Sequence, residues 1–112
     1  MTEDTKQRLA DMRAYARVAH QLVGGRALGS FLQDDRTRLA IQYCLLVIGE
    51  ASVNVDASTR EAMTQVPWLA LRGMRNRLAH AYSSVDPGTV YITVVRDLPA
   101  LMKAFDVDRS ES

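Results

Sequence analysis

The sequence predicts an all-α protein, an antiparallel bundle of four to five helices in a single domain. Apolar residues recur every three to four positions along most of the chain, which is the period of one face of an α-helix. The breaks between these segments are short and carry glycine, proline or a capping residue. At 112 residues, the chain suffices for one hydrophobic core but not for two. We therefore expect one domain over residues 1–112, with a helical core at about 4–105 and a disordered, mostly polar tail at 106–112.

The first helix is expected over about Asp4–Val23. Its apolar stripe consists of Leu9, Met12, Tyr15, Val18 or Ala19, and Leu22. Gly24 and Gly25 end it, because glycine readily adopts the left-handed conformation that closes a helix. Arg13, Arg17 and His20 form a row on one face of the same helix. That row is either solvated or helps to hold an RNA backbone, and the sequence leaves both readings open.

The second helix is expected over about Asp34–Val53, and its middle, Ile41–Ile48, is apolar almost all round. Such a helix lies at the centre of a bundle or packs against another subunit, and we expect both, hence a homodimer. Cys44, the only cysteine, lies in this apolar run, so we expect a buried thiol and no internal disulfide. Glu50 ends the run. Its carboxylate either orients an arginine of the active site or marks the return to solvent.

A capping box at Ser58–Glu61 predicts a short helix over about Thr59–Gln65. Pro67 suits the first turn of the next helix. The buried stripe of that helix is expected to comprise Trp68, Leu71, Met74 and Leu78. On its opposite side, Arg72, Asn76 and His80 follow each other at intervals of four residues, so these three side chains can line one groove.

The last helix is expected over about Pro87–Phe105. The segment VYITVV has the β-branched composition of a strand. Against a strand, Asp86 and Pro87 make a good helix start, and apolar residues keep a helical period through Val90, Val94, Leu98, Leu101 and Phe105. We therefore predict a helix that Pro99 bends or interrupts.

The composition indicates a globular protein with a local basic site. Hydrophobic residues make up 47% of the chain and charged residues 24%, and the net charge is only +1. Arg72, Arg75 and Arg77 nevertheless fall within six positions. The chain has no zinc-ligand spacing, no run of 18 apolar residues and no apolar signal segment at its start. We therefore expect a soluble, cytoplasmic protein without a metal site or membrane contact.

The segment RNRLAHAY, residues 75–82, carries the chemistry. The guanidinium of Arg75 offers a planar fork of donors that matches phosphate oxygens. An imidazole such as that of His80 can both accept and donate a proton near neutral pH. Together these groups can activate a ribose 2′-hydroxyl, protonate the leaving oxygen and stabilise the charge that develops on phosphorus. These are the functional groups that a ribonuclease needs in order to cleave RNA without a metal ion.

Helical geometry separates the two residues of this pair. Five residues at about 100° each place Arg75 roughly 140° around the helix from His80. Joint action therefore needs the reach of the arginine side chain, a helix end near His80, or a cleft completed by a neighbouring subunit.

RNRLAHAY fits the R-x4-H-x-Y pattern of the HEPN superfamily, and the chain resembles its HepT-like toxin branch in further blocks. These are Ala40 followed by IGEA at 48–51, Pro67-Trp68 followed by RGMRN at 72–76, and SVDPGTVYITVVRDLPAL at 84–101. The resemblance covers about residues 5–106.

The resemblance implies a catalytic pair of Arg75 and His80, with His80 as general base or acid and no cofactor. Arg72 and Arg77 would support RNA binding. Asn76 would do the same by a hydrogen bond to the phosphate, or would fix the tautomer of His80. It also implies a homodimer whose two motifs face one another across a shared cleft. Tyr82 is either an RNA contact or the residue that a cognate minimal nucleotidyltransferase antitoxin modifies with AMP, which would exclude RNA by charge and bulk if Tyr82 is exposed.

The leading hypothesis is thus the endoribonuclease toxin of a type VII-like toxin–antitoxin system. The alternative is a non-catalytic HEPN bundle that binds RNA or the nucleotidyltransferase, and a purely structural dimerisation bundle is a third reading. The sequence does not distinguish tRNA from mRNA as the substrate.

Overall fold

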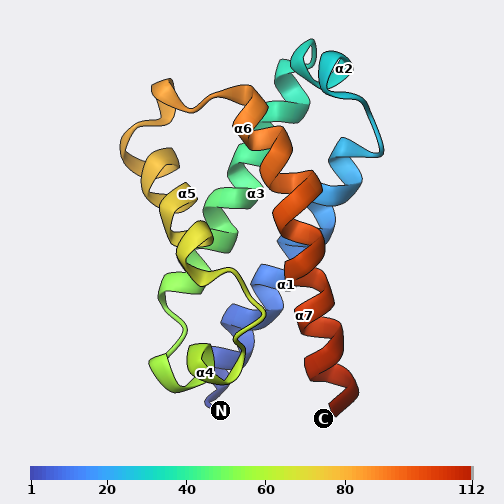
Figure 1. Ribbon diagram of the computed structural model, residues 1–112. Helices are drawn as coiled ribbons and strands as arrows, with labels where there is room; N and C mark the ends of the chain where they lie inside the picture. The colour runs from blue at the N-terminus through green and yellow to red at the C-terminus, as the bar shows by residue number, and fades with distance from the viewer. Residues whose placement is uncertain (112) are drawn as a thin grey trace.

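The computed structural model describes the backbone of residues 1–111 and the side chains of residues 1–105. Every regular element in this part of the chain is helical, which confirms the predicted all-α class (Figure 1). The helices are α1 (Glu3–Val23), α2 (Leu28–Leu32), α3 (Asp35–Val53), α4 (Ala57–Ala62), α5 (Trp68–His80), α6 (Pro87–Ile92) and α7 (Leu98–Glu111). A 3₁₀ turn at Tyr82–Ser84 follows α5, and a π-helical turn at Thr93–Asp97 joins α6 to α7.

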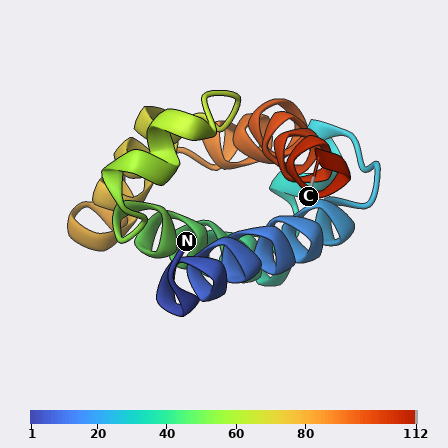
Figure 2. The ribbon, with the colours of Figure 1, turned by 90° about the horizontal axis from the view of Figure 1, so that it is seen from below.

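Helix α3 is the central element of the bundle. It packs against α1 on one side and α5 on another, while α7 packs against α1. Seen from below, the helices surround a shared centre (Figure 2). Apolar side chains from all of the long helices fill that centre, and Met12, Ile41, Ile48, Val94 and Leu101 are fully buried there. Burial of this apolar surface is the main force that holds the bundle together.

The apolar run of α3 is buried only on part of its circumference. Ile41, Cys44, Leu45 and Ile48 lie in the core, as the sequence predicts. Burial raises the pKa of the Cys44 thiol. Tyr43, in contrast, is 59% exposed and makes an edge contact with the ring of Tyr15 on α1, with centroids 6.1 Å apart. The homodimer expected from the all-round apolar composition of α3 stays a prediction.

The ends of α1 and the start of α3 follow the sequence signals. Gly24 closes α1 in the left-handed conformation, with φ of 59°. The Asp34 carboxylate caps α3: it accepts hydrogen bonds from the Thr37 hydroxyl at 2.7 Å, the Thr37 amide at 3.0 Å and Nη1 of Arg26 at 2.7 Å. These bonds, led by those from Thr37, hold the pKa of Asp34 well below its usual range. The short helix α2 between these two helices carries no periodic signal and is not predicted.

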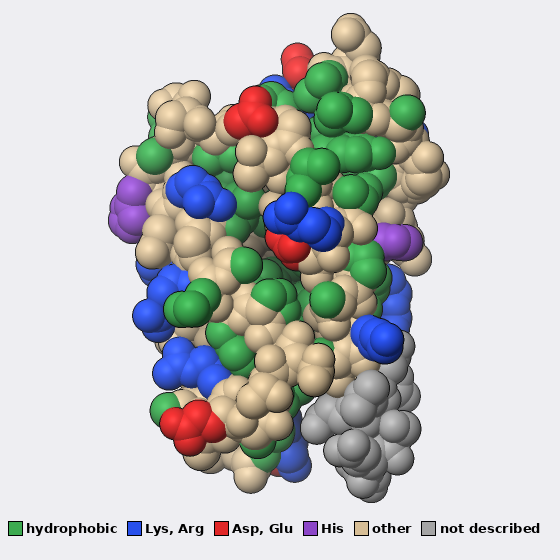
Figure 3. All heavy atoms as spheres, viewed as in Figure 1, with side chains coloured by type: hydrophobic (Ala, Val, Ile, Leu, Met, Phe, Trp, Pro, Cys, Tyr) green, Lys and Arg blue, Asp and Glu red, His purple; other side chains and the backbone are tan. Residues whose placement is uncertain are grey.

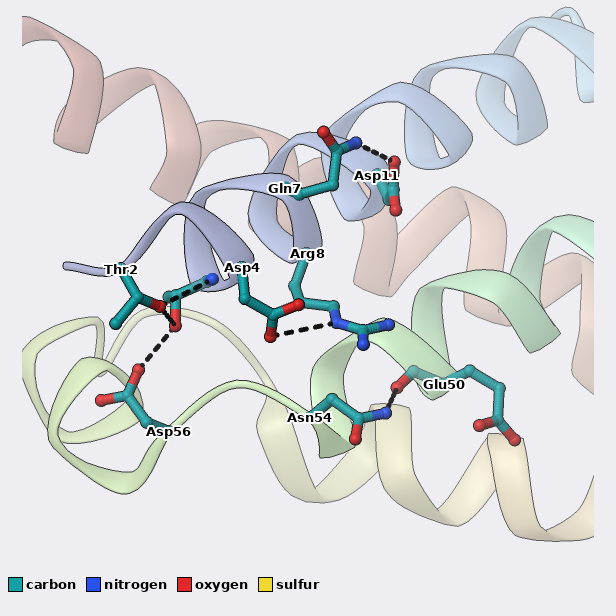
Figure 4. Close-up of polar contacts among 9 residues, drawn as sticks. Thr2, Asp4, Gln7, Arg8, Asp11, Glu50, Asn54 and Asp56 are labelled. Atoms are coloured by element: carbon teal, nitrogen blue, oxygen red, sulfur yellow. Dashed lines mark hydrogen bonds and ion pairs between the residues drawn. The ribbon is translucent and has the colours of Figure 1, made fainter.

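The predicted start of α4 is wrong by two residues. Asp56, not Ser58, is its N-cap, and α4 spans 57–62 instead of the expected 59–65. The Asp56 carboxylate accepts hydrogen bonds from the Thr59 amide and from the hydroxyls of Ser58 and Thr59. It also accepts one from the Thr5 hydroxyl of α1 at 2.9 Å. Figure 4 shows Asp56 below the first turn of α1, joined to that turn by this bond. The pKa of Asp56 is lowered, chiefly by the hydrogen bonds from the Ser58 hydroxyl, the Thr59 hydroxyl and the Thr59 amide. A carboxylate that accepts this many hydrogen bonds is a stronger helix cap here than the hydroxyl of Ser58.

The C-terminal segment is helical, as predicted, and its interruption lies just before Pro99. The Leu98 amide donates to the Thr93 carbonyl five residues back, which defines the π-helical turn. Pro99 has no N–H and its ring would press on the carbonyl four residues earlier, so a widened turn accommodates it. The expected end of this helix near Phe105 is wrong, because the backbone of α7 is helical to Glu111. The disordered tail from Asp106 stays a prediction. Ser112 lies outside the described residues.

None of the described helices is both long enough and apolar enough to cross a membrane.

Candidate active site

Helix α5 positions the residues of the RNRLAHAY segment. Its buried face carries Leu71, Met74 and Leu78, and half-buried Trp68 packs beside them, as the apolar stripe predicts. Pro67 is the N-cap instead of the expected first-turn residue. The helix ends at His80, where Ala81 leaves the helical conformation and its amide donates to the Arg77 carbonyl at 2.8 Å. Cationic groups near this end are favoured by the helix dipole.

Gly49 sets the distance between α3 and α5. A Cβ atom built on Gly49 would overlap the Cβ of Arg75 and lie 3.1 Å from the Leu71 carbonyl oxygen. Only a residue without a side chain lets α5 approach α3 this closely. The sequence offered no signal for this role beyond a lone glycine in a helical run, and the close approach places Arg75 next to the residue that follows Gly49.

That residue is Glu50, and its carboxylate holds Arg75. Nε of Arg75 donates to Oε1 of Glu50 at 2.7 Å. In Figure 4 the Glu50 side chain extends toward α5, while its backbone carbonyl accepts from Asn54 at 2.8 Å. Of the two alternatives for Glu50, the contact with an arginine is present. That this arginine belongs to an active site stays a prediction. The Arg75 and Glu50 side chains are 28% and 45% exposed, so the pair lies at the surface and not in the core.

Asn76 completes the support of the guanidinium. Nη1 of Arg75 donates to Oδ1 of Asn76 at 2.9 Å. The bonds to Glu50 and Asn76 use two of the five guanidinium N–H groups and leave three that can donate to a ligand. The Asn76 oxygen is occupied by Arg75, which leaves its amide N–H groups for other acceptors. This arrangement fixes the plane of the fork and leaves its outer edge open.

His80 lies on a different side of α5 from Arg75, as the helical arithmetic predicts. It is exposed, together with Arg72, Asn76 and Arg77. Within the described part of the chain no hydrogen bond or ion pair joins His80 to Arg75. The single chain therefore brings Arg75, Asn76 and Glu50 together, and presents His80 about one and a half turns further along the helix.

Tyr82 lies just beyond α5, at the start of the 3₁₀ turn, and is 73% exposed. Among the described residues its hydroxyl has no hydrogen-bond partner, whereas that of Tyr91 donates to the Arg26 carbonyl at 2.6 Å. The exposure that the sequence interpretation requires of Tyr82 is present.

Comparisons with known proteins agree with the resemblance. A family model described as ribonuclease HepT-like matches residues 12–107. The chain belongs to the HepT-like ribonuclease family. It is 30% identical over 106 residues to a Thermococcus cleftensis protein named "Probable ribonuclease HepT", with 95% of this chain and 96% of that protein covered.

Shorter matches within the family name the same activity. A Methanocaldococcus jannaschii protein named as a candidate RNase is 36% identical over 76 residues, which cover 68% of this chain and 63% of that protein. Another from Caldanaerobacter subterraneus is 33% identical over 81 residues, or 72% of each chain. No solved structure matches this chain.

The other basic row of this HepT-like protein lies on α1. Arg17 and His20 are exposed, and Arg13 and Arg17 flank a shallow depression beside Ala10 and Ala14. Helix α1 packs chiefly on α3 and α7, whereas α5 packs chiefly on α3. The basic row of α1 is therefore carried by a different helix from the RNRLAHAY segment, and these two helices are not main packing partners. Within the described side chains, no group of three or more His, Cys, Asp or Glu could hold a metal ion.

Proposed function

We propose that this HepT-like protein is an endoribonuclease toxin that cleaves RNA without a metal, through Arg75 and His80. The observation that carries the proposal is the arginine held by two neighbours. Glu50 and Asn76 fix the guanidinium of Arg75 by bonds of 2.7 and 2.9 Å and leave its remaining donors toward solvent. A preorganised fork of this kind stabilises charge on phosphate oxygens without reorganising during the reaction.

The proposed reaction is an internal transesterification. An imidazole of His80 takes the proton of the ribose 2′-hydroxyl, whose oxygen attacks the adjacent phosphorus. The bond from phosphorus to the 5′-oxygen breaks, and that oxygen leaves with a proton from an imidazolium. The products are a 2′,3′-cyclic phosphate and a 5′-hydroxyl. Arg75 donates to the non-bridging oxygens as negative charge accumulates on them.

A homodimer would supply what one chain lacks. His80 and Arg75 lie on different sides of α5, and one imidazole cannot be base and acid in the same instant. Two chains with facing α5 ends would offer two imidazoles and two arginines to one phosphodiester. Arg72, Arg77 and Asn76 would then hold the strand on either side. Exposure of all three side chains supports this part of the proposal.

Tyr82 is the proposed point of control by a nucleotidyltransferase antitoxin. Its hydroxyl oxygen would attack the α-phosphorus of ATP, pyrophosphate would leave, and the tyrosine would carry an AMP group. The added negative phosphate and bulky base would lie two residues from His80 and exclude RNA. The support is that Tyr82 is 73% exposed.

The first test is cleavage of total RNA by the purified protein in EDTA, with end analysis for cyclic phosphates. His80→Ala and Arg75→Ala should each reduce cleavage at least 100-fold, since each removes a proton-transfer or charge-stabilising group. The matched control is Arg36→Ala, an exposed arginine at the start of α3. RNA bound but uncut by the wild-type protein would favour a binding module instead, and cleavage unchanged in both variants would refute the assignment.

The second test concerns Tyr82. Incubation with ATP and a nucleotidyltransferase of the same genome should add one AMP mass to the wild-type chain and silence cleavage. Tyr82→Phe should still cleave RNA but should not receive AMP. Tyr43→Phe, at another exposed tyrosine, should receive AMP as the wild-type protein does. Labelling of Tyr82→Phe would place the modification elsewhere.

A further inference from the structure

A cavity at the start of α5 is not used by the proposed reaction. It has a volume of about 350 Å³ and lies between the end of α3, α4 and the first turns of α5. This volume is at the lower end of the range for small-ligand sites. Its lining includes Arg60 and Glu61 from α4, and Trp68, Leu69 and Arg72 from α5. Figure 3 shows basic side chains along the edge of the molecule over α4 and α5.

Trp68 gives the cavity an aromatic wall. Its indole Nε1 donates to the Met63 carbonyl at 3.0 Å, which holds the ring in place. Because the only polar atom of the ring is occupied, the indole offers carbon surface to the cavity. Leu69 adjoins it and is 83% exposed, so this apolar rim lies open. An open, fixed aromatic surface suits the face of a nucleobase.

The charged groups around this wall favour a nucleotide over a simple anion. Arg60 and Arg72 make no ion pair within the described part of the chain, so both guanidinium groups are available to a phosphate. Glu61 lines the same cavity, and its carboxylate would repel a phosphate placed beside it. A carboxylate does accept hydrogen bonds from the N–H groups of a base edge. Two cations, one acceptor and one aromatic face match the parts of a single nucleotide.

The position on α5 connects the cavity to the candidate active site. Arg72 lines the cavity and also begins the exposed row that continues through Asn76 to His80. Eight residues of helix span roughly 12 Å, so a strand laid along this row passes from the cavity to His80. We propose that the cavity binds one unpaired nucleotide of the RNA substrate, beside the cleaved bond, with its base against Trp68 and its phosphate between Arg60 and Arg72. This inference rests on the proposed function.

Trp68 is the only tryptophan, so tryptophan fluorescence reports on this one wall of the cavity. The full chain is titrated with a short 2′-O-methyl oligoribonucleotide, which lacks the attacking hydroxyl, and with an abasic oligomer of the same length and charge. The base-bearing oligomer should quench Trp68 and bind about 5- to 150-fold more tightly than the abasic one. Equal quenching by both, or no change at saturation, would overturn the base contact.

Variants locate the site. Arg60→Ala should weaken oligomer binding about tenfold and raise KM for cleavable RNA more than it lowers kcat. Leu69→Ser, at a position too exposed to disturb the core, should weaken the base-bearing oligomer selectively. The matched control is Arg36→Ala, the same charge change at the other end of α3, which should bind as wild type. Binding by Arg60→Ala equal to that of Arg36→Ala would overturn the proposal.

The possible outcomes distinguish failure of the proposed nucleotide site from failure of the proposed nuclease function. Normal cleavage without a Trp68 response removes the nucleotide site and leaves the nuclease assignment intact. A Trp68 response that depends on Arg60, in a wild-type protein that cuts no RNA, supports the nucleotide site and retires the nuclease assignment.

Discussion

Substitution of Gly49 by alanine tests whether the contact between α3 and α5 positions Arg75. The added Cβ would overlap the Arg75 Cβ and approach the Leu71 carbonyl oxygen to 3.1 Å. Both atoms belong to, or are next to, the backbone of α5, so no flexible side-chain end can move away. Helix α5 must therefore shift relative to α3, and Arg75 must move with it away from Glu50.

The magnitude follows from two opposing terms. Overpacking of a well-packed contact costs about 1–3 kcal/mol. Replacing a helical glycine by alanine returns about 1 kcal/mol through helix propensity. We expect Gly49→Ala to lower the free energy of unfolding by up to about 2 kcal/mol and to reduce RNA cleavage more than tenfold, because a displacement of about 1 Å at a catalytic group can cost 100-fold in rate.

Gly73→Ala is the matched control. Gly73 lies inside α5, and a Cβ there would meet nothing within 4 Å. This variant gains the propensity term without overpacking, so its free energy of unfolding should rise by up to about 1 kcal/mol. Urea denaturation followed by circular dichroism measures both variants, and cleavage is assayed on the same preparations. If Gly49→Ala were as stable as Gly73→Ala and cleaved RNA as well as wild type, the argument that Gly49 spaces the helices would be refuted.

Three further predictions concern single side chains. Glu50→Gln should change the free energy of unfolding by less than about 1 kcal/mol, since the pair with Arg75 is partly exposed. It should nevertheless lower kcat about tenfold, because Arg75 loses its positioning partner. Glu3→Gln is the control, and equal kcat in both variants would contradict the positioning role. Because hydrogen bonds lower the pKa of Asp34 below its ordinary value of 3.8, its stabilising effect is present above that pH and lost as the pH falls further, so urea midpoints of wild type and Asp34→Asn should differ at pH 7 and converge toward pH 2. Cys44 is 4% exposed and its pKa is raised by burial, so a thiol reagent at pH 7 should modify it quickly in urea and only slowly in the native protein; rapid native modification would show that the core of α3 opens readily.

Much of the fold could be predicted because its signals are local. The periods of α1, α3 and α5, the start of α3 near Asp34 and the end of α1 at Gly24 depend on residues within a few positions of each other. The start of α4 could not be predicted this way. Asp56 competes with Ser58 for the cap and is held by Thr5, a residue 51 positions away on α1.

The candidate site shows the same difference between features set by nearby residues and features set by distant ones. The residue types of RNRLAHAY, the angular separation of Arg75 and His80, and the exposed row through Asn76 followed from sequence and helical geometry. The role of Glu50 remained open, and that of Gly49 was missed, because both depend on contacts across two packed helices. Glu50 and Gly49 lie 25 and 26 positions from Arg75 in the sequence. Helical period tells which face a side chain occupies, but only the packing distance between α3 and α5 decides what that face touches.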